Sequence, residues 1–218
     1  MRSPVPPATK WVAAVVLAGW LTLVLLLGAG GAFVGRPGTP PLAILIGFAV
    51  PLIVFFAGFR WWRPFRDFVL TVDPRVMMGL QAWRFGGLGF LALYANGILP
   101  GNFAIPAGLG DMAIGVTAPL LLAVLVRQPT FAASKTFVVW NALGVLDLVV
   151  AMTTGALGSM HAVGGVGDVT TGPMAQLPLL LIPAYLVPIF IMLHMGAFLQ
   201  ARRLAGHRAE QAQSGAVV

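Results

Sequence analysis

Three charged residues lie within stretches of sequence that are otherwise strongly apolar, and they are the residues with which this chain could do chemistry. Arg84 lies in QAWRFGGLGFLAL, Asp111 in GLGDMAIGVTAPLLLAVLV and Asp147 in WNALGVLDLVVAM. A charge at the depth of a lipid bilayer is costly, so it usually faces a bundle interior or a water-filled cavity and has a partner. Two carboxylates and one guanidinium at that depth predict either a structural ion pair or a site that responds to protons or ions.

Asn141 and His194 are two further polar residues in apolar surroundings. Asn141 shares a helical face with Asp147, because the two are joined by steps of three residues along one apolar stretch. His194 is a candidate proton relay, since imidazole exchanges protons near neutral pH, although a lone histidine in a helix is more often a hydrogen-bonded packing residue. We therefore predict a polar core of Arg84, Asp111, Asp147, Asn141 and His194.

The depth of each charge within its apolar stretch decides which ion pairs are plausible. Arg84 lies about six residues inside the predicted cytoplasmic end of its stretch, and Asp147 lies near the middle of its own. The Arg84 side chain can cover the roughly 8 Å between these two levels, so we expect an Arg84–Asp147 ion pair. Asp111 is expected in the first turns of a helix near the outer surface, where free N–H groups and the helix dipole stabilise a carboxylate without a cationic partner.

The elements that carry these residues are predicted to be membrane-spanning helices. The chain has 218 residues, of which 59% are hydrophobic and 9% charged, and its mean hydropathy is +0.93. That much apolar surface exceeds what the core of one soluble domain could bury. We predict an all-α, polytopic membrane protein with a single membrane domain over residues 1–218. Its six transmembrane helices cover about residues 11–34, 41–59, 78–99, 106–126, 136–157 and 176–199.

Basic residues in the predicted loops indicate the orientation. Eleven of them fall in the two tails and the even-numbered loops, and one falls in the odd-numbered loops. This bias predicts that both termini are cytoplasmic. The first span is expected to be retained in the membrane, because its apolar run is longer than that of an ordinary signal peptide.

The segment RWWRPFRDFVLTVDPR, between the second and third spans, alternates arginines with aromatic residues. Such a pattern can bind nucleic acid, but beside a span it more often lies in the lipid headgroup layer. We predict one interfacial amphipathic segment with a modest attraction to anionic lipids, and no nucleic-acid partner. The lipid bilayer is the predicted partner, and a homo-oligomer or another membrane protein stays open as a second one.

Several chemistries have no residues to carry them. The chain has no cysteine, which excludes disulfides, thiolate metal sites and a cysteine nucleophile. The three histidines fall at different predicted depths, so a bis-histidine haem is not expected. No metal cluster and no Ser-His-Asp order occurs in the sequence. We predict no cofactor and no metal, and an enzyme is the less favoured class.

The chain from Arg84 onward resembles a group of small bacterial integral membrane proteins of unknown function. The resemblance covers about the last 120 residues. It is carried by RFGGLGFLALYANGILPGNFAIPAGLGD, WNALGVLDLVVA and LPLLLIPAYLVPIFIMLHM. The resemblance implies a multi-pass protein of the bacterial cytoplasmic (inner) membrane, and it assigns no activity and no site residue.

Two functions fit this pattern of buried charge. The first is a small-solute or proton-coupled carrier or channel-like element, with Asp147 as the central titrating group and Arg84 as its counter-charge. In that reading Asp111 is an outer gate residue and His194 an inner relay. The alternative is a non-catalytic membrane scaffold or partner subunit, in which the same charges hold the helices together. Access of water to the carboxylates distinguishes the two.

Overall fold

A computed structural model describes residues 7–36, 38–160 and 169–215. These residues form helices and their connections, with no strand among them, so the predicted all-α class is confirmed. The elements in chain order are α1 Pro7–Ala29, α2 Leu42–Trp61, α3 Arg63–Thr71, α4 Pro74–Leu80, η1 Gln81–Gly87, α5 Leu88–Ala95, α6 Gly101–Arg127, η2 Pro129–Ala133, α7 Lys135–Met160, η3 Gly172–Ala175, η4 Ile182–Leu186 and α8 Val187–Gly215.

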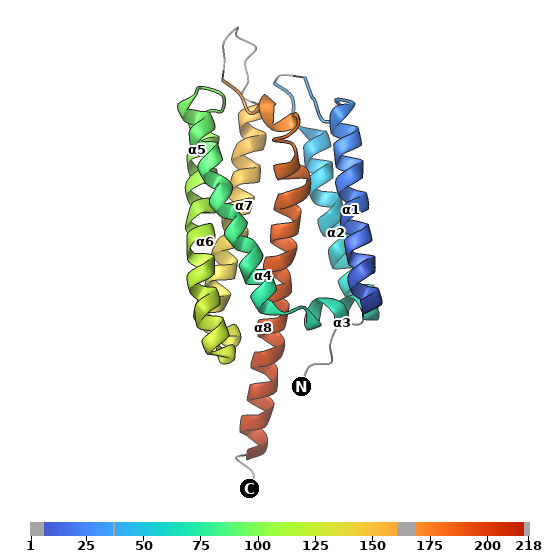
Figure 1. Cartoon of the computed structure of the whole chain (residues 1–218), viewed down its shortest axis with the longest axis vertical. Coiled ribbons are helices and arrows are strands. Elements are labelled where there is room, and N and C mark those ends of the chain that lie inside the picture. Colours follow the sequence, from blue (N-terminus) through green and yellow to red (C-terminus); the bar gives the residue numbers. More distant parts are fainter. Residues whose placement is uncertain (1–6, 37, 161–168, 216–218) are drawn as a thin grey trace.

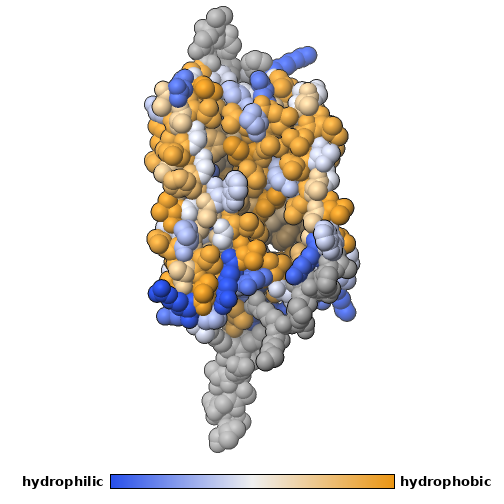
Figure 2. All heavy atoms as spheres, viewed as in Figure 1, coloured by the Kyte–Doolittle hydropathy of each residue, from blue (hydrophilic) through white to orange (hydrophobic). Residues whose placement is uncertain are grey.

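Among the described residues, 6 helices are long and apolar enough to cross a membrane. The third of them consists of α4, η1 and α5 in succession, and the last comprises η4 and the first part of α8. The long helices lie side by side along one axis, and α1 begins at the same end of the bundle at which α8 ends (Figure 1). Apolar side chains cover the middle of the face drawn in Figure 2, while hydrophilic ones gather towards both ends, which is compatible with a bilayer-spanning bundle.

The short helix α3 runs across one end of the bundle (Figure 1). Trp62 is extended and separates α2 from α3, and Pro64 lies in the first turn of α3, where its missing N–H costs nothing. The side chain of Gln200, on α8, donates hydrogen bonds to the carbonyl oxygens of Val69 and Val72 at 2.9 and 2.8 Å. These two bonds fasten α3 and the connection after it to α8.

The third membrane-length helix changes to a 3₁₀ helix in its middle, over the 7 residues of η1. At three residues per turn, Gln81, Arg84 and Gly87 lie on one face, and all three are buried. This face packs against α6, where a Cβ atom added to Gly115 would lie 2.7 Å from the carbonyl carbon of Arg84. Glycine therefore allows the two backbones to approach this closely and sets Arg84 against α6.

The helix α6 begins at Gly101, earlier than the predicted start of its span near residue 106. Pro100 precedes the helix in an extended conformation, and Pro106 lies inside it. Asp111 is therefore about ten residues, or roughly 15 Å, from the start of the helix. The expectation that Asp111 occupies the first turns of a helix near a surface is wrong.

The sixth membrane-length helix begins at Ile182, whereas its span was predicted from about residue 176. It opens with the π-helical turn η4, which contains Pro183 and is followed by Pro188 in α8. Each proline lacks the N–H group that would bond the carbonyl oxygen four residues earlier. The wider π-helical turn accommodates such gaps. The side chains of Pro183 and Ala184 are buried, so this face of the segment lies towards the bundle interior.

Two apolar clusters flank the polar residues along the helices that carry them. On α6, Ala107 belongs to the cluster around Phe103, and Ile114 belongs to the cluster around Trp140. Asp111 lies between these two positions in the same helix. The apolar core of the bundle is thus interrupted in its middle by a polar layer.

Candidate functional site

Arg84 is the centre of a buried polar cluster, and its side chain is 0% exposed. Its Nε atom lies 2.7 Å from Oδ1 of Asp111 on α6, and its Nη2 atom pairs with a carboxylate oxygen of Asp147 on α7. Its Nη1 atom donates to the carbonyl oxygen of Gly144 at 3.2 Å. Each nitrogen of the guanidinium therefore has an acceptor, as a buried arginine requires.

His194, on α8, completes the cluster on the far side of the guanidinium. Its Nε2 atom lies 3.2 Å from Nη1 of Arg84, and its Nδ1 atom lies 2.8 Å from Oδ1 of Asn141. Arginine can only donate, so Nε2 accepts and the ring proton resides on Nδ1, which donates to Asn141. The Asn141 side chain in turn donates to the carbonyl oxygen of Phe137 at 2.8 Å. This chain of bonds holds a neutral imidazole in place.

Trp140 supports His194 from α7. The two rings meet edge to face with their centroids 5.5 Å apart, and Trp140 Nε1 donates to the hydroxyl of Thr117 on α6 at 2.9 Å. The hydroxyl of Thr117 donates in turn to the carbonyl oxygen of Ala113 at 2.6 Å. Every polar atom of this support has a partner, so the orientation of the imidazole is fixed by packing and hydrogen bonds together.

Three glycines make room for the cluster. A Cβ atom added to Gly110 would overlap the Asp147 carboxylate, and one added to Gly144 would overlap the His194 ring. A Cβ atom on Gly87 would lie 2.5 Å from the Cβ atom of Asp111. The polar side chains of the cluster thus occupy the space left by absent side chains on the facing helices.

The structure brings together all five predicted polar-core residues: Arg84, Asp111, Asp147, Asn141 and His194. The expected Arg84–Asp147 ion pair is present. The expectation that Asp111 has no cationic partner is wrong, because Asp111 is bonded to Arg84. Its distance from the start of α6 places it beyond the free N–H groups of the helix terminus, so the arginine takes their role.

Sequence reasoning missed Trp140, Thr117, Gly110 and Gly144 as parts of the cluster. For two of them, position in the sequence could have indicated a place in the cluster. Trp140 directly precedes Asn141, and Gly144 lies midway between Asn141 and Asp147 on the same helical face. Glycines in membrane helices usually serve close helix packing, and nothing in the sequence separates that role from making space for a charged side chain.

The charges of the cluster do not cancel. Arg84 contributes one positive charge and two ionised carboxylates contribute two negative charges, while the hydrogen bonds keep His194 neutral. Among the described residues, no second cationic side chain forms a salt bridge with Asp111 or Asp147, whose side chains are 15% and 14% exposed. An uncompensated charge in a low-dielectric interior is costly. One bound proton or one bound cation would balance the cluster.

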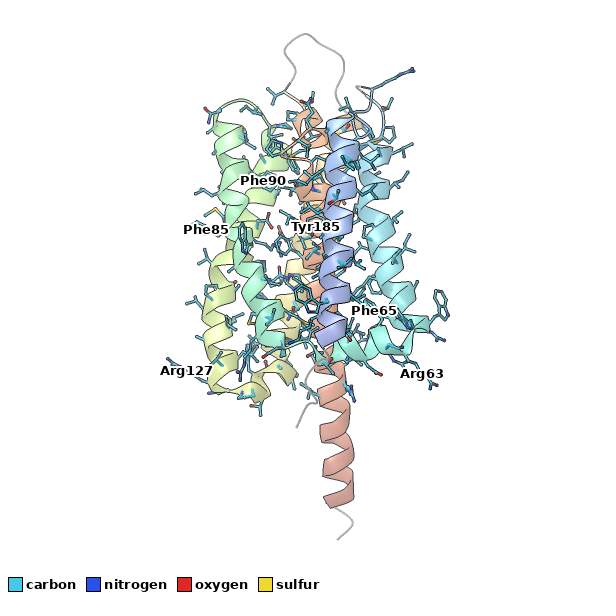
Figure 3. All side chains as sticks on the ribbon, turned by 45° about the vertical axis from the view of Figure 1, so that its right-hand side comes forward. Arg63, Phe65, Phe85, Phe90, Arg127 and Tyr185 are labelled. Carbon is cyan, nitrogen blue, oxygen red and sulfur yellow. The ribbon has the colours of Figure 1, made fainter. Side chains whose placement is uncertain are left out.

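A cavity of about 460 Å³ reaches Asp111, the one residue of the polar cluster that lines it. Its other end is lined by Arg36, Ser159, Thr170 and Gln176, at the end of the bundle where α1 connects to α2 and α7 ends (Figure 1). Figure 3 shows Phe90, another lining residue, in the half of the bundle opposite to Arg63 and Arg127. The cavity thus leads from one end of the bundle to the ion pairs.

The described residues contain no group of three or more His, Cys, Asp or Glu side chains that could hold a metal ion.

Residues 41–202 match a family described as a domain of unknown function, DUF8737. The match covers most of the chain, which therefore belongs to this family. Comparisons with curated proteins and with solved structures found no match.

Proposed function

We propose that this chain, as a member of that family, is a multi-pass protein of the bacterial cytoplasmic membrane that acts as a carrier or channel-like element for a small solute, coupled to protons. The observation that carries the proposal is that one residue, Asp111, both lines the cavity and binds Arg84. A proton or solute that enters the cavity can therefore act directly on the buried ion pairs. Binding sites in the middle of the bilayer, lined by charged groups and interrupted helices, are typical of transporters.

The orientation in this proposal rests on the basic residues. Eleven lie in the tails and even-numbered predicted loops, against one in the odd-numbered loops, which favours cytoplasmic termini. The cavity then opens towards the outside of the cell, because it lies at the end opposite to the start of α1. The helix α3 would lie in the cytoplasmic headgroup layer, with Arg63 and its neighbours towards the lipid phosphates.

Arg84 provides the coupling. When Asp111 binds a proton, Arg84 Nε loses its anionic partner, while the guanidinium keeps its bonds to Asp147 and to the Gly144 carbonyl oxygen. Loss of the proton restores the second ion pair. An arginine that pairs with both carboxylates in one state and with Asp147 alone in the other is a discrete two-state element, and a transport cycle needs such an element. Asp147 is then the central carboxylate, Arg84 its counter-charge and Asp111 the outer gate.

His194 has a more restricted role here than a free relay. Its Nε2 atom accepts from Arg84, so it can take up a proton only when the guanidinium moves away. The imidazole therefore responds to the position of Arg84. It can act as an inner relay only in a state in which Arg84 no longer donates to its Nε2 atom.

Proton flux into proteoliposomes tests the proposal. Vesicles that contain a pH-sensitive dye, a K⁺ gradient and valinomycin would be measured with and without an ultrafiltrate of bacterial cells as the source of solutes. We expect flux in the wild type and its loss in Asp111→Asn and Asp147→Asn. Asp67→Asn makes the same chemical change on the exposed side of α3 and should behave as the wild type. Folded wild type without flux under either condition would contradict the proposal.

The second candidate is a membrane scaffold or partner subunit, and the complete pairing of the Arg84 guanidinium favours it. A variant that combines Arg84→Gln with Asp111→Asn and Asp147→Asn separates the two, because it removes all three charges and leaves no buried carboxylate without a partner. A scaffold would keep its function in the triple variant, while Arg84→Gln alone lowers expression. A carrier would express as the triple variant but be inactive.

A further inference from the structure

The wall of the cavity is mainly apolar and partly aromatic. Phe33, Phe90 and Phe103 line it, together with Leu148 and Met152. A volume of about 460 Å³ lies within the range of small-molecule sites. Aromatic rings attract cations through their electron-rich faces, most strongly where water is excluded. A wall of this kind suits a compact solute with an apolar body.

The charge at the inner end of the cavity is negative. Among the described lining residues, Asp111 is the one acidic side chain, and Arg36 the one basic side chain. Arg36 is exposed at the mouth, where water and salt screen its charge. Asp111 belongs to a cluster that carries one negative charge in excess when both carboxylates are ionised.

We propose that this cavity binds a small organic cation with an apolar body, such as an amine, quaternary ammonium or phosphonium ion, with its charge towards Asp111. The inference rests on the proposed function and names the class of its solute. The cation supplies the positive charge that the cluster lacks, and the phenylalanines surround its apolar part.

A proton and an organic cation then compete for the same negative charge. The charged and titratable groups that face Asp111 are Arg84 from η1, Asp147 from α7, His194 from α8 and, across the cavity, Arg36. Arg84 stays positive throughout, and His194 stays neutral while it accepts from Arg84. Binding of the cation is therefore expected to displace one proton from the pair of carboxylates and to become tighter as the pH rises.

Equilibrium binding of tetraphenylphosphonium tests the inference, with tetraphenylborate as an anion of the same shape. The protein would be purified into nanodiscs of phosphatidylcholine, which has no net charge. We expect the wild type to bind the phosphonium and not the borate. Asp111→Asn should weaken phosphonium binding about tenfold or more and abolish its pH dependence, while Asp67→Asn, outside the cavity, should leave both unchanged.

Ala151→Phe provides a test by volume alone, because Ala151 lines the cavity and the change adds no charge. It should block phosphonium binding and leave the ion pairs intact. Ala156→Phe, at another lining position, serves if the first variant does not fold.

Equal binding of the two probes, or phosphonium binding that survives Asp111→Asn, would overturn the inference. Asp111-dependent proton flux without phosphonium binding would overturn this inference alone. Asp111-dependent phosphonium binding without proton flux would overturn the proposed function alone.

Discussion

Arg84 is shared by two carboxylates, and this sharing determines what each substitution in the cluster costs. Removal of Arg84 leaves both Asp111 and Asp147 without a cationic partner, whereas removal of either carboxylate leaves one ion pair and no excess charge. We therefore predict that Arg84→Gln lowers the free energy of unfolding by about 3–5 kcal/mol, the range for breaking a buried pair. Asp111→Asn and Asp147→Asn should each cost less.

Thermal unfolding in detergent would measure the three variants side by side, with Asp67→Asn as the control for the chemical change. A smaller loss for Arg84→Gln than for either aspartate variant would contradict the shared pairing. If Asp111 needed no cationic partner, as the sequence predicted, Asp111→Asn would be nearly neutral and Asp147→Asn more harmful. The bond between Asp111 and Arg84 removes the basis of that difference, so the two aspartate variants should now lie close together.

Gln81 is a second buried polar residue whose substitution can be predicted. It is 1% exposed, its Nε2 atom donates to the Phe190 carbonyl oxygen at 3.3 Å, and its Oε1 atom has no hydrogen-bond partner among the described residues. An unsatisfied buried polar atom costs about 1–3 kcal/mol. We predict that Gln81→Met, which keeps the length of the side chain, leaves the melting temperature unchanged or raises it. A clear decrease would show that Oε1 binds a group essential to the fold.

At the scale of the elements, the glycines of α6 and α7 decide whether the cluster can form. Gly144→Ala would drive a methyl group into the His194 ring, whereas nothing lies within 4 Å of a Cβ atom on Gly89 in α5. Overpacking of a buried site typically costs about 1–3 kcal/mol, while alanine is the better residue in an open helical position. We predict that Gly144→Ala lowers the melting temperature and Gly89→Ala does not. Equal effects would show that the space around His194 is not set by Gly144.

The elements also show where sequence reasoning reaches its limit. Hydropathy and helical periodicity predicted the class of the fold and the faces of Asn141 and Asp147, because both depend on local pattern. The start of α6 was misjudged, since a proline inside a helix and a proline before a helix look alike in sequence. That error of about five residues moved Asp111 from the interior to a surface and hid its pairing with Arg84.

At the scale of the whole molecule, the cavity could not be predicted from the chain. Its lining comes from the connection after α1, from α2, α5, α6 and α7, from the segment before η4, and from η4 and the first residue of α8. No sequence pattern joins these segments, and only the packing of the bundle brings them to one place. The division of the surface into an apolar middle and hydrophilic ends (Figure 2) is, by contrast, a direct consequence of composition along each helix.

The proposed orientation gives a prediction at this scale. If the basic residues govern insertion, reporters fused after Arg127 or at the C-terminal tail will report the cytoplasm. Reporters inserted after Arg36, or near Gly164, which lies outside the described residues, will report the outside. The readout is a pair of enzymes active on opposite sides of the membrane. A C-terminal tail outside the cytoplasm would contradict an even number of spans with cytoplasmic termini.

In the proposed function the carboxylates of the polar cluster exchange a proton with the aqueous phase through the cavity. Infrared difference spectroscopy on membranes taken from alkaline to acidic pH tests it most directly, because a protonated carboxyl has its own carbonyl-stretch band. We expect a band that shifts in heavy water, is lost when Asp111→Asn and Asp147→Asn are combined, and is suppressed by Ala151→Phe, which fills the cavity. No such band over the pH range in which the protein stays folded, or a band unaffected by these changes, would contradict it.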